Sequence, residues 1–200
     1  MKGTLKYTVE KMCGGNYRKF PHGSEVSFSI KDMEEISFDG KMEVLVGGCY
    51  CMIPVHFIQQ VVATTDEDNK LFEILAARIK QHEKICEIEA CSEEDSYFYL
   101  DGEEGIPFKQ NFYQDEFLEF SPFLGNEPDW MFTNSIAVRN LLRDFAVNTA
   151  LEAGVEIYSI GCCNFDSWFA LRYVDGQWKN IDGIDEYYSD IEELRKLIFN

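Results

Sequence analysis

Residues 134–179 read NSIAVRNLLRDFAVNTALEAGVEIYSIGCCNFDSWFALRYVDGQWK, and this stretch decides the fold. Apolar residues recur over 134–150 mostly at steps of three and four, which predicts an amphipathic helix. Gly154 follows this run, where a left-handed residue can close a helix without a side-chain penalty. Val155–Ile160 alternates in character, and Ser167–Val174 is rich in aromatic and β-branched residues, so both stretches predict strands. A helix leading into antiparallel strands is therefore expected here.

Two Asp-Gly pairs predict tight hairpins elsewhere in the chain. Asp175-Gly176 follows the second of these strands, and Asp39-Gly40 separates two stretches whose apolar residues alternate. Asp-Gly is typical of two-residue hairpin loops, because their backbone takes positive φ angles that bulky residues avoid. We therefore expect turns with positive φ at both places.

The first quarter of the sequence predicts a meander of four or five strands. Within it we expect a loop over residues 17–23, and a buried strand pair over Cys49–Val62 that bends at Pro54. Thr65 is expected to cap a long helix whose apolar face continues as far as Ile85.

The last element should be a closing helix over Asp185–Phe199. This order of elements is typical of the α+β class, and we expect antiparallel β-sheets with about three helices packed on one side. We expect a single α+β domain over residues 1–200, or two lobes divided near 92–95. No internal repeat is evident in the sequence.

The charge balance is the most unusual property of the composition. The chain has 36 acidic and 18 basic residues, a formal net charge of −18. A field of this sign repels nucleic acid and anionic membranes and attracts cationic partners. The alternative interpretation is that the acids serve solubility alone.

The cysteine content and the N-terminal sequence favour a reducing cytoplasm. There are seven cysteines, which is an odd number, and the neighbours Cys162-Cys163 cannot readily join each other. Residues 1–10 lack the apolar core of a secretory signal. No apolar run approaches the roughly 18 residues that a membrane span needs. We expect free thiols and a cytoplasmic protein that does not bind membranes.

Motifs for cofactors and metals do not match the sequence. Cys49-Tyr50-Cys51 and the Cys162-Cys163 pair lack the spacing of zinc ligands. The Gly-Gly pairs lack the spaced glycines of a phosphate-binding loop. We expect neither a cofactor nor a metal ion. A small cysteine-dependent enzyme, with its nucleophile among these four cysteines, is the alternative to a binding protein; structural thiols are the simpler interpretation.

The acids are concentrated in one part of the sequence. From Glu83 to Asp129 there are fourteen acids and two bases, a local charge of −12. Ten aromatic residues are interleaved between Tyr97 and Trp130. Aromatic anchors beside carboxylates suit a basic protein surface, because carboxylates can engage Arg and Lys. The predicted partner-binding residues are Glu93, Glu94, Asp95, Asp101, Glu103, Glu104, Asp115, Glu116 and Glu119. The alternative is a solvated acidic face with its aromatics turned inward.

These observations lead to a hypothesis of a non-enzymatic cytoplasmic inhibitor. It would engage a basic nucleic-acid-binding protein or a nuclease, and would not bind nucleic acid directly. By analogy alone, the chain resembles anti-CRISPR, anti-restriction and nuclease-immunity proteins, and no motif carries a residue role over from them. A structural or oligomeric module is a third interpretation, and the sequence does not define the oligomeric state.

Overall fold

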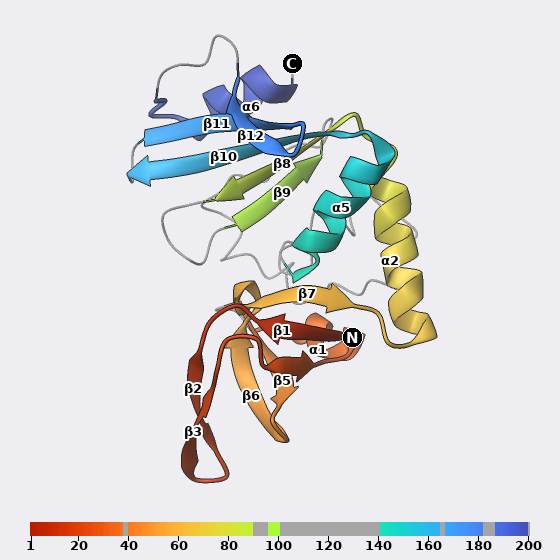
Figure 1. Cartoon of the computed structure of the whole chain (residues 1–200), viewed down its shortest axis with the longest axis vertical. Helices are drawn as coiled ribbons and strands as arrows, with labels where there is room; N and C mark the ends of the chain where they lie inside the picture. The colour runs from red at the N-terminus through yellow and green to blue at the C-terminus, as the bar shows by residue number, and fades with distance from the viewer. Residues whose placement is uncertain (38–39, 90–95, 101–140, 165–166, 182–186, 200) are drawn as a thin grey trace. The chain divides into compact units, whose positions relative to one another are not determined.

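The computed structural model describes residues 1–37, 40–89, 96–100, 141–164, 167–181 and 187–199 (Figure 1). Contacts divide the chain into two compact units, which are described separately. Unit 1 comprises Met1–Ala76 and Ile106–Ala146, and unit 2 comprises Ala77–Gly105 and Val147–Asn200. The lobe boundary expected near 92–95 lies outside the described residues, and the domain organisation stays a prediction.

Unit 1 is built on a five-stranded sheet in which all neighbouring strands are antiparallel. The strand order is β6-β5-β4-β1-β7. The strands are β1 (Lys2–Leu5), β4 (Glu25–Ser27), β5 (Lys41–Val46), β6 (Cys49–Pro54) and β7 (Ile58–Val62). A short 3-10 helix, η1 (Val55–Phe57), joins β6 to β7. Two strands divided after Pro54 are therefore confirmed, but β6 and β7 lie at opposite edges of the sheet and each is only partly buried.

Alternation along the strands explains which face of this sheet is buried. In β5, Met42 and Val44 are buried while Glu43 between them is exposed. In β6, Cys51 is buried while Tyr50 is exposed. Successive side chains of a strand point to opposite faces, so one apolar row per strand builds the core.

A separate hairpin of β2 (Val9–Cys13) and β3 (Asn16–Phe20) corrects the loop expected over residues 17–23. Gly14-Gly15 forms its turn with φ of 57° and 84°. Every residue of β3 except Phe20 is exposed, so β3 lacks the apolar alternation by which a strand is usually detected.

A short helix, α1 (Ile30–Glu34), follows β4. The strand expected at Ile36 and Phe38 is not formed at Ile36 and Ser37, and Phe38 lies outside the described residues. The Ser29 hydroxyl accepts from the Asp32 amide at 3.2 Å, and the Asp32 carboxylate accepts from the Ser29 amide at 2.6 Å. This reciprocal capping box starts the helix. Gly40 has the expected positive φ of 69°, whereas Asp39 lies outside the described residues.

Helix α2 (Asp66–Ile79) begins where Thr65 predicts it and ends earlier than expected. Its buried stripe consists of Leu71, Leu75 and Ile79. The following apolar residues belong to strand β8 (Lys84–Glu89), which pairs in parallel with β10 (Glu156–Asn164). The expectation that the helix continues to Ile85 is therefore wrong. Pairing with a distant strand determines the conformation of that segment.

Helix α5 (Arg143–Ala153) closes as the sequence predicts. Gly154 has φ of 73°, and its amide donates to the Leu151 carbonyl at 3.2 Å. The Val155 amide donates to the Ala150 carbonyl at 2.9 Å. These two bonds form a Schellman motif, which satisfies carbonyls at the end of the helix. The start expected at 134–140 lies outside the described residues.

Unit 2 contains a second five-stranded sheet, with the order β12-β11-β10-β8-β9. Its remaining strands are β9 (Ser96–Leu100), β11 (Ser167–Val174) and β12 (Gln177–Asn180). The β8–β10 pair is parallel and the other neighbours are antiparallel. The Asp175-Gly176 hairpin is confirmed, with φ of 54° and 78°.

Helix α6 (Ile191–Phe199) packs on β10 and β11 and buries Leu194 and Ile198. It begins later than the expected residue 185. Tyr188 and Trp168 exchange backbone hydrogen bonds of 2.8 and 2.9 Å, which keeps the preceding segment extended.

The fold class is α+β, as predicted, with antiparallel sheets and the helices α2, α5 and α6. Packing of the three helices on one side stays a prediction. Within the described residues, no helix has both the length and the apolar character needed to cross a membrane.

Candidate functional site

The acids predicted to bind a partner all lie outside the described residues. They are Glu93, Glu94, Asp95, Asp101, Glu103, Glu104, Asp115, Glu116 and Glu119. Their role stays a prediction. Among the described residues, carboxylates and aromatic rings line one hollow on α2.

The N-terminus of α2 is the best-anchored part of unit 1. The Asp68 carboxylate is 3% exposed and accepts from the Thr64 amide at 2.8 Å and the Thr65 amide at 3.1 Å. The Thr65 hydroxyl accepts from the Asp68 amide at 3.1 Å, which completes a capping box. This confirms Thr65 as the helix cap.

The N-terminal ammonium of Met1 adds a buried charge to this cap. It lies 2.9 Å from the Asp68 carboxylate and donates to the Phe28 carbonyl at 2.7 Å. Burial alone would raise the pKa of Asp68, but the Thr64 amide and the ammonium stabilise the carboxylate and hold the pKa below its ordinary value. The first turn of α2 is thereby fixed to the N-terminal strand.

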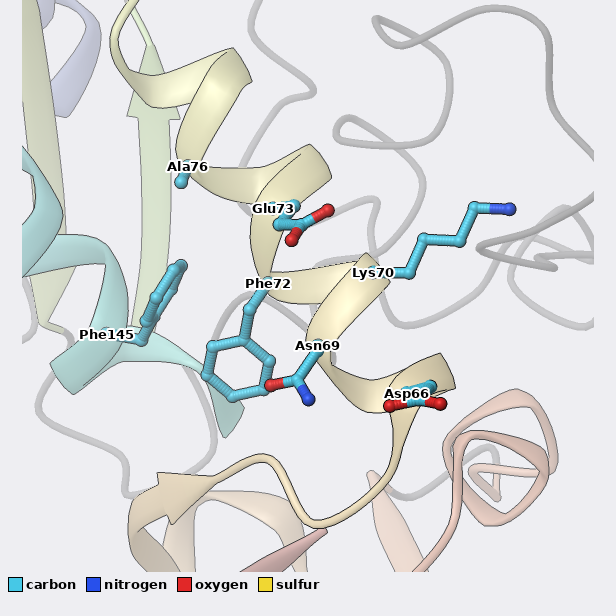
Figure 2. Close-up of a pocket in the computed structure, with 7 residues that line it drawn as sticks. All are labelled: Asp66, Asn69, Lys70, Phe72, Glu73, Ala76 and Phe145. Atoms are coloured by element: carbon cyan, nitrogen blue, oxygen red, sulfur yellow. The ribbon is translucent and has the colours of Figure 1, made fainter.

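Helix α2 carries a surface hollow beyond this anchored turn (Figure 2). The hollow has a volume of about 740 Å³. It is lined by Asp66, Asn69, Lys70, Phe72, Glu73, Ala76 and Phe145. Asp66 and Glu73 are two helical turns apart and share one face with Asn69 and Lys70.

Two phenyl rings form the apolar part of the hollow. Phe72 of α2 and Phe145 of α5 meet edge to face, with centroids 4.4 Å apart and planes inclined by 80°. Both rings are partly exposed. Figure 2 shows the Lys70 side chain directed away from this aromatic pair, so its charge is displaced from the rings.

The position of Phe145 depends on contacts of the α5 turn that carries it. The carboxylate of Asp144 accepts from the Gln60 amide at 2.9 Å, which ties α5 to β7. Leu142 and Ala146 on either side are buried. The sequence places Phe145 on an apolar helix face, but it does not reveal that the partner of this ring is Phe72.

Aromatic rings and carboxylates both line the hollow. A guanidinium group can stack on a phenyl ring and donate to carboxylates at the same time. Phe72 lies next to the buried stripe of α2, not within it. A large apolar residue beside such a stripe is the signal by which this ring could have been noticed in the sequence.

The thiols proposed for a cysteine-dependent enzyme lie in two strands. Cys49 and Cys51 belong to β6, and Cys162 and Cys163 belong to β10. A hydrogen bond with Cys13 raises the pKa of the Cys49 thiol, and burial adds to this effect; the Arg18 charge opposes it. An activated nucleophile needs the opposite shift, towards the thiolate.

The Cys163 thiol is hydrogen-bonded to Tyr187 and raises the pKa of this phenol. In the part of the chain that the structure describes, no three His, Cys, Asp or Glu side chains gather so that they could hold a metal ion.

Comparison with known proteins gives no relative. No family model matches the chain, and neither a curated protein nor a solved structure is significantly similar to it.

Proposed function

We propose that this protein is a cytoplasmic inhibitor that covers a basic surface of a nucleic-acid-handling protein. The anti-CRISPR, anti-restriction and nuclease-immunity proteins are its functional analogues. The observation that carries the proposal is the charge of −18, of which −12 falls between Glu83 and Asp129 among aromatic residues.

The mechanism is competition for cationic side chains. Carboxylates take the place of phosphates as partners of Arg and Lys, so the partner loses its nucleic acid. Long-range attraction accelerates association, and the attraction between exposed charges falls off beyond about 10 Å at 0.1 M salt. Aromatic rings contribute by slowing dissociation, because packed anchors carry much of the affinity of an interface.

The hollow on α2 offers the same chemistry among the described residues. Phe72 and Phe145 provide ring faces and edges, while Asp66 and Glu73 provide carboxylates on one side of the helix. An arginine of the partner fits this combination better than a lysine, because a guanidinium is planar and donates to two oxygens at once. The hollow is therefore proposed as an arginine subsite on unit 1.

The test has two stages, and the second one decides. The protein, immobilised through its C-terminus, is first used to capture host proteins at low salt. A captured basic protein is then purified, and release of a labelled oligonucleotide from it is measured as the inhibitor is added. We expect release at low salt and a marked loss of release at high salt.

Matched variants separate specific carboxylates from total charge. Glu93→Gln, Glu94→Gln and Asp95→Asn are combined in one variant, and Asp66→Asn with Glu73→Gln in another. The control neutralises three exposed acids elsewhere, Glu10, Glu43 and Glu152. We expect slower association for both test variants and a smaller effect for the control.

Two results contradict the proposal. One is that captured proteins keep their nucleic acid in the presence of the inhibitor. The other is an affinity that changes neither with salt nor with loss of these carboxylates, which would make the acids a solubility feature.

A replacement of Phe72 by Leu keeps an apolar side chain but removes the ring, and it should accelerate dissociation.

A further inference from the structure

In unit 1, Cys13 meets two cysteines that are distant from it in the sequence. The Sγ atoms of Cys13 and Cys51 lie 3.4 Å apart. Cys49 interacts with the same Cys13 thiol, and its Sγ accepts from Nη1 of Arg18 at 3.2 Å. Together Cys13, Cys49 and Cys51 form a cluster of thiols, which we call the thiol trio.

Two hairpins bring the trio together. Cys13 ends β2 immediately before the Gly14-Gly15 turn, and Cys49 begins β6 immediately after the Gly47-Gly48 turn. β2 contacts β6 within unit 1, where the β2–β3 hairpin lies beside the sheet (Figure 1). The residues Cys49 and Cys51 are two positions apart and therefore share one face of β6.

Accessibility differs within the trio. Cys13 is 6% exposed and Cys51 is 5% exposed, whereas Cys49 is partly exposed. A reagent from solvent therefore reaches Cys49 first. The pair closest to each other, Cys13 and Cys51, lies behind it.

We propose that Cys13 and Cys51 are a redox-active dithiol, and that Cys49 is the relay thiol through which a low-molecular-weight disulfide oxidises them. The two buried sulfurs must approach from 3.4 Å to a bond length of about 2.05 Å. Cys49 and Cys51 are poor candidates for a direct disulfide, because neighbouring positions on one face of a strand hold their side chains roughly parallel.

The reaction consists of three thiol–disulfide exchanges. The Cys49 thiolate attacks the disulfide RSSR, forms a mixed disulfide and releases one RS⁻. The Cys13 thiolate then attacks the Cys49 sulfur and releases the second RS⁻. Finally the Cys51 thiolate attacks the Cys13 sulfur, which forms the Cys13–Cys51 bond and returns Cys49 as a thiolate.

The overall reaction balances in atoms and electrons without any other reactant. Two protein thiols and one RSSR give one protein disulfide and two RSH, so two electrons pass to RSSR and the thiol protons end on the RSH products. Arg18, 3.2 Å from the Cys49 sulfur, favours the thiolate, but the Cys13 thiol and burial outweigh it and raise the pKa of Cys49, so the exchange proceeds through the minor thiolate fraction. The new bond ties the β2–β3 hairpin covalently to β6.

The test uses the reduced full-length chain and oxidised glutathione as the disulfide. Samples are quenched with an alkylating reagent over time, digested and mapped by mass spectrometry. We expect a linked peptide pair containing Cys13 and Cys51 as the final product, with Cys49 alkylated. The melting temperature should rise on oxidation and fall back on reduction, because the bond restricts the unfolded chain.

Single and double variants distinguish the relay thiol from the two thiols that form the disulfide. Cys49→Ser should slow the oxidation several-fold and still give the same final pair. Cys162→Ser with Cys163→Ser is the matched control in unit 2 and should leave the rate unchanged. Circular dichroism of each reduced variant checks that it is folded. The disulfide mapping by mass spectrometry uses the unmodified chain, so it still tests the Cys13–Cys51 bond if a variant does not fold.

The outcomes distinguish the two parts of the proposal. Failure to find Cys13 linked to Cys51, or a final disulfide between other cysteines, overturns the dithiol. Oxidation of the Cys49→Ser variant at the rate of the unmodified chain overturns the relay. A Cys49-linked glutathione adduct that persists as the final product also overturns the dithiol.

Discussion

Replacement of Asp68 by Asn tests the buried ion pair at the start of α2. Asn keeps the size of the side chain and one acceptor oxygen but removes the charge. The Met1 ammonium is fully buried beside it, with the Phe28 carbonyl as a further acceptor at 2.7 Å. Breaking a buried pair by neutralising one partner costs about 3–5 kcal/mol, because it leaves an uncompensated charge. We expect Asp68→Asn to lower the free energy of unfolding by about 3 kcal/mol, since the acceptor oxygen is retained.

The measurement is urea denaturation of the chain with a free amine at Met1. A Thr65→Ala variant is the control, because it removes the capping hydroxyl at 3.1 Å and leaves the ion pair intact. Loss of such a cap costs about 1 kcal/mol. The prediction is contradicted if Asp68→Asn lowers the unfolding free energy no more than Thr65→Ala does, while both variants keep the same slope of free energy against urea concentration. The ion pair would then contribute little to stability.

The same pair predicts how stability depends on pH. The folded pKa of Asp68 lies below its ordinary value, which is about 3.9 in an unfolded chain. The contribution of this carboxylate is therefore fully present above about pH 4 and is lost as the pH falls through the folded pKa. Asp68→Asn should make the unfolding free energy less dependent on pH below about 4. An unchanged acid dependence would show that other carboxylates dominate.

Two further predictions concern glycines in unit 2. Gly161→Ala should destabilise the fold by about 1–2 kcal/mol, because the new Cβ would lie 2.5 Å from Cζ of Phe169. The cost should be smaller when Phe169 is also replaced by Ala, and urea denaturation of the two single variants and the double variant measures this coupling. Gly176→Val should destabilise by about 1 kcal/mol or more at φ of 78°, whereas Gly176→Asn should cost less; equal melting temperatures for the two variants would contradict the argument from backbone conformation.

Local signals predicted much of the fold. The Asp175-Gly176 turn, the Gly154 helix end and the Thr65 cap all depend on residues within a few positions of each other. The Ser29–Asp32 capping box was an equally local signal for α1, but the alternation around it suggested strands. A short stretch of sequence cannot decide between a helix and a strand when a capping box and an apolar alternation both occur in it.

Non-local pairing accounts for the main errors. The segment from Ile85 to Ile88 continues the apolar spacing of α2, but it forms β8 because it pairs in parallel with β10. The partner strand lies far away in the sequence, and periodicity carries no information about it. The exposed strand β3 was missed for a related reason, since its pairing with β2 leaves little apolar alternation to detect.

The candidate sites show the same limit. The acids predicted to bind a partner lie outside the described residues, so that surface stays a prediction. The contact between Phe72 and Phe145 joins two helices from distant parts of the sequence. The thiol trio joins two hairpins in the same way. The sequence analysis did not single out the residues of the hollow, and these long-range contacts required the tertiary structure.

Salt can separate the charges that stabilise the fold from those proposed to bind a partner. The ion pairs Lys2–Glu25, Lys19–Glu10 and Lys31–Glu35 are exposed. Each such pair contributes about 0–1 kcal/mol and is screened by salt, whereas the buried pair at Asp68 is screened much less. Because the chain carries a net charge of −18, added salt also relieves repulsion between its acids. Moderate salt should therefore maintain or raise the unfolding free energy while it weakens association with a basic partner. Opposite responses of stability and binding would show that lost binding at high salt reflects the interface and not partial unfolding.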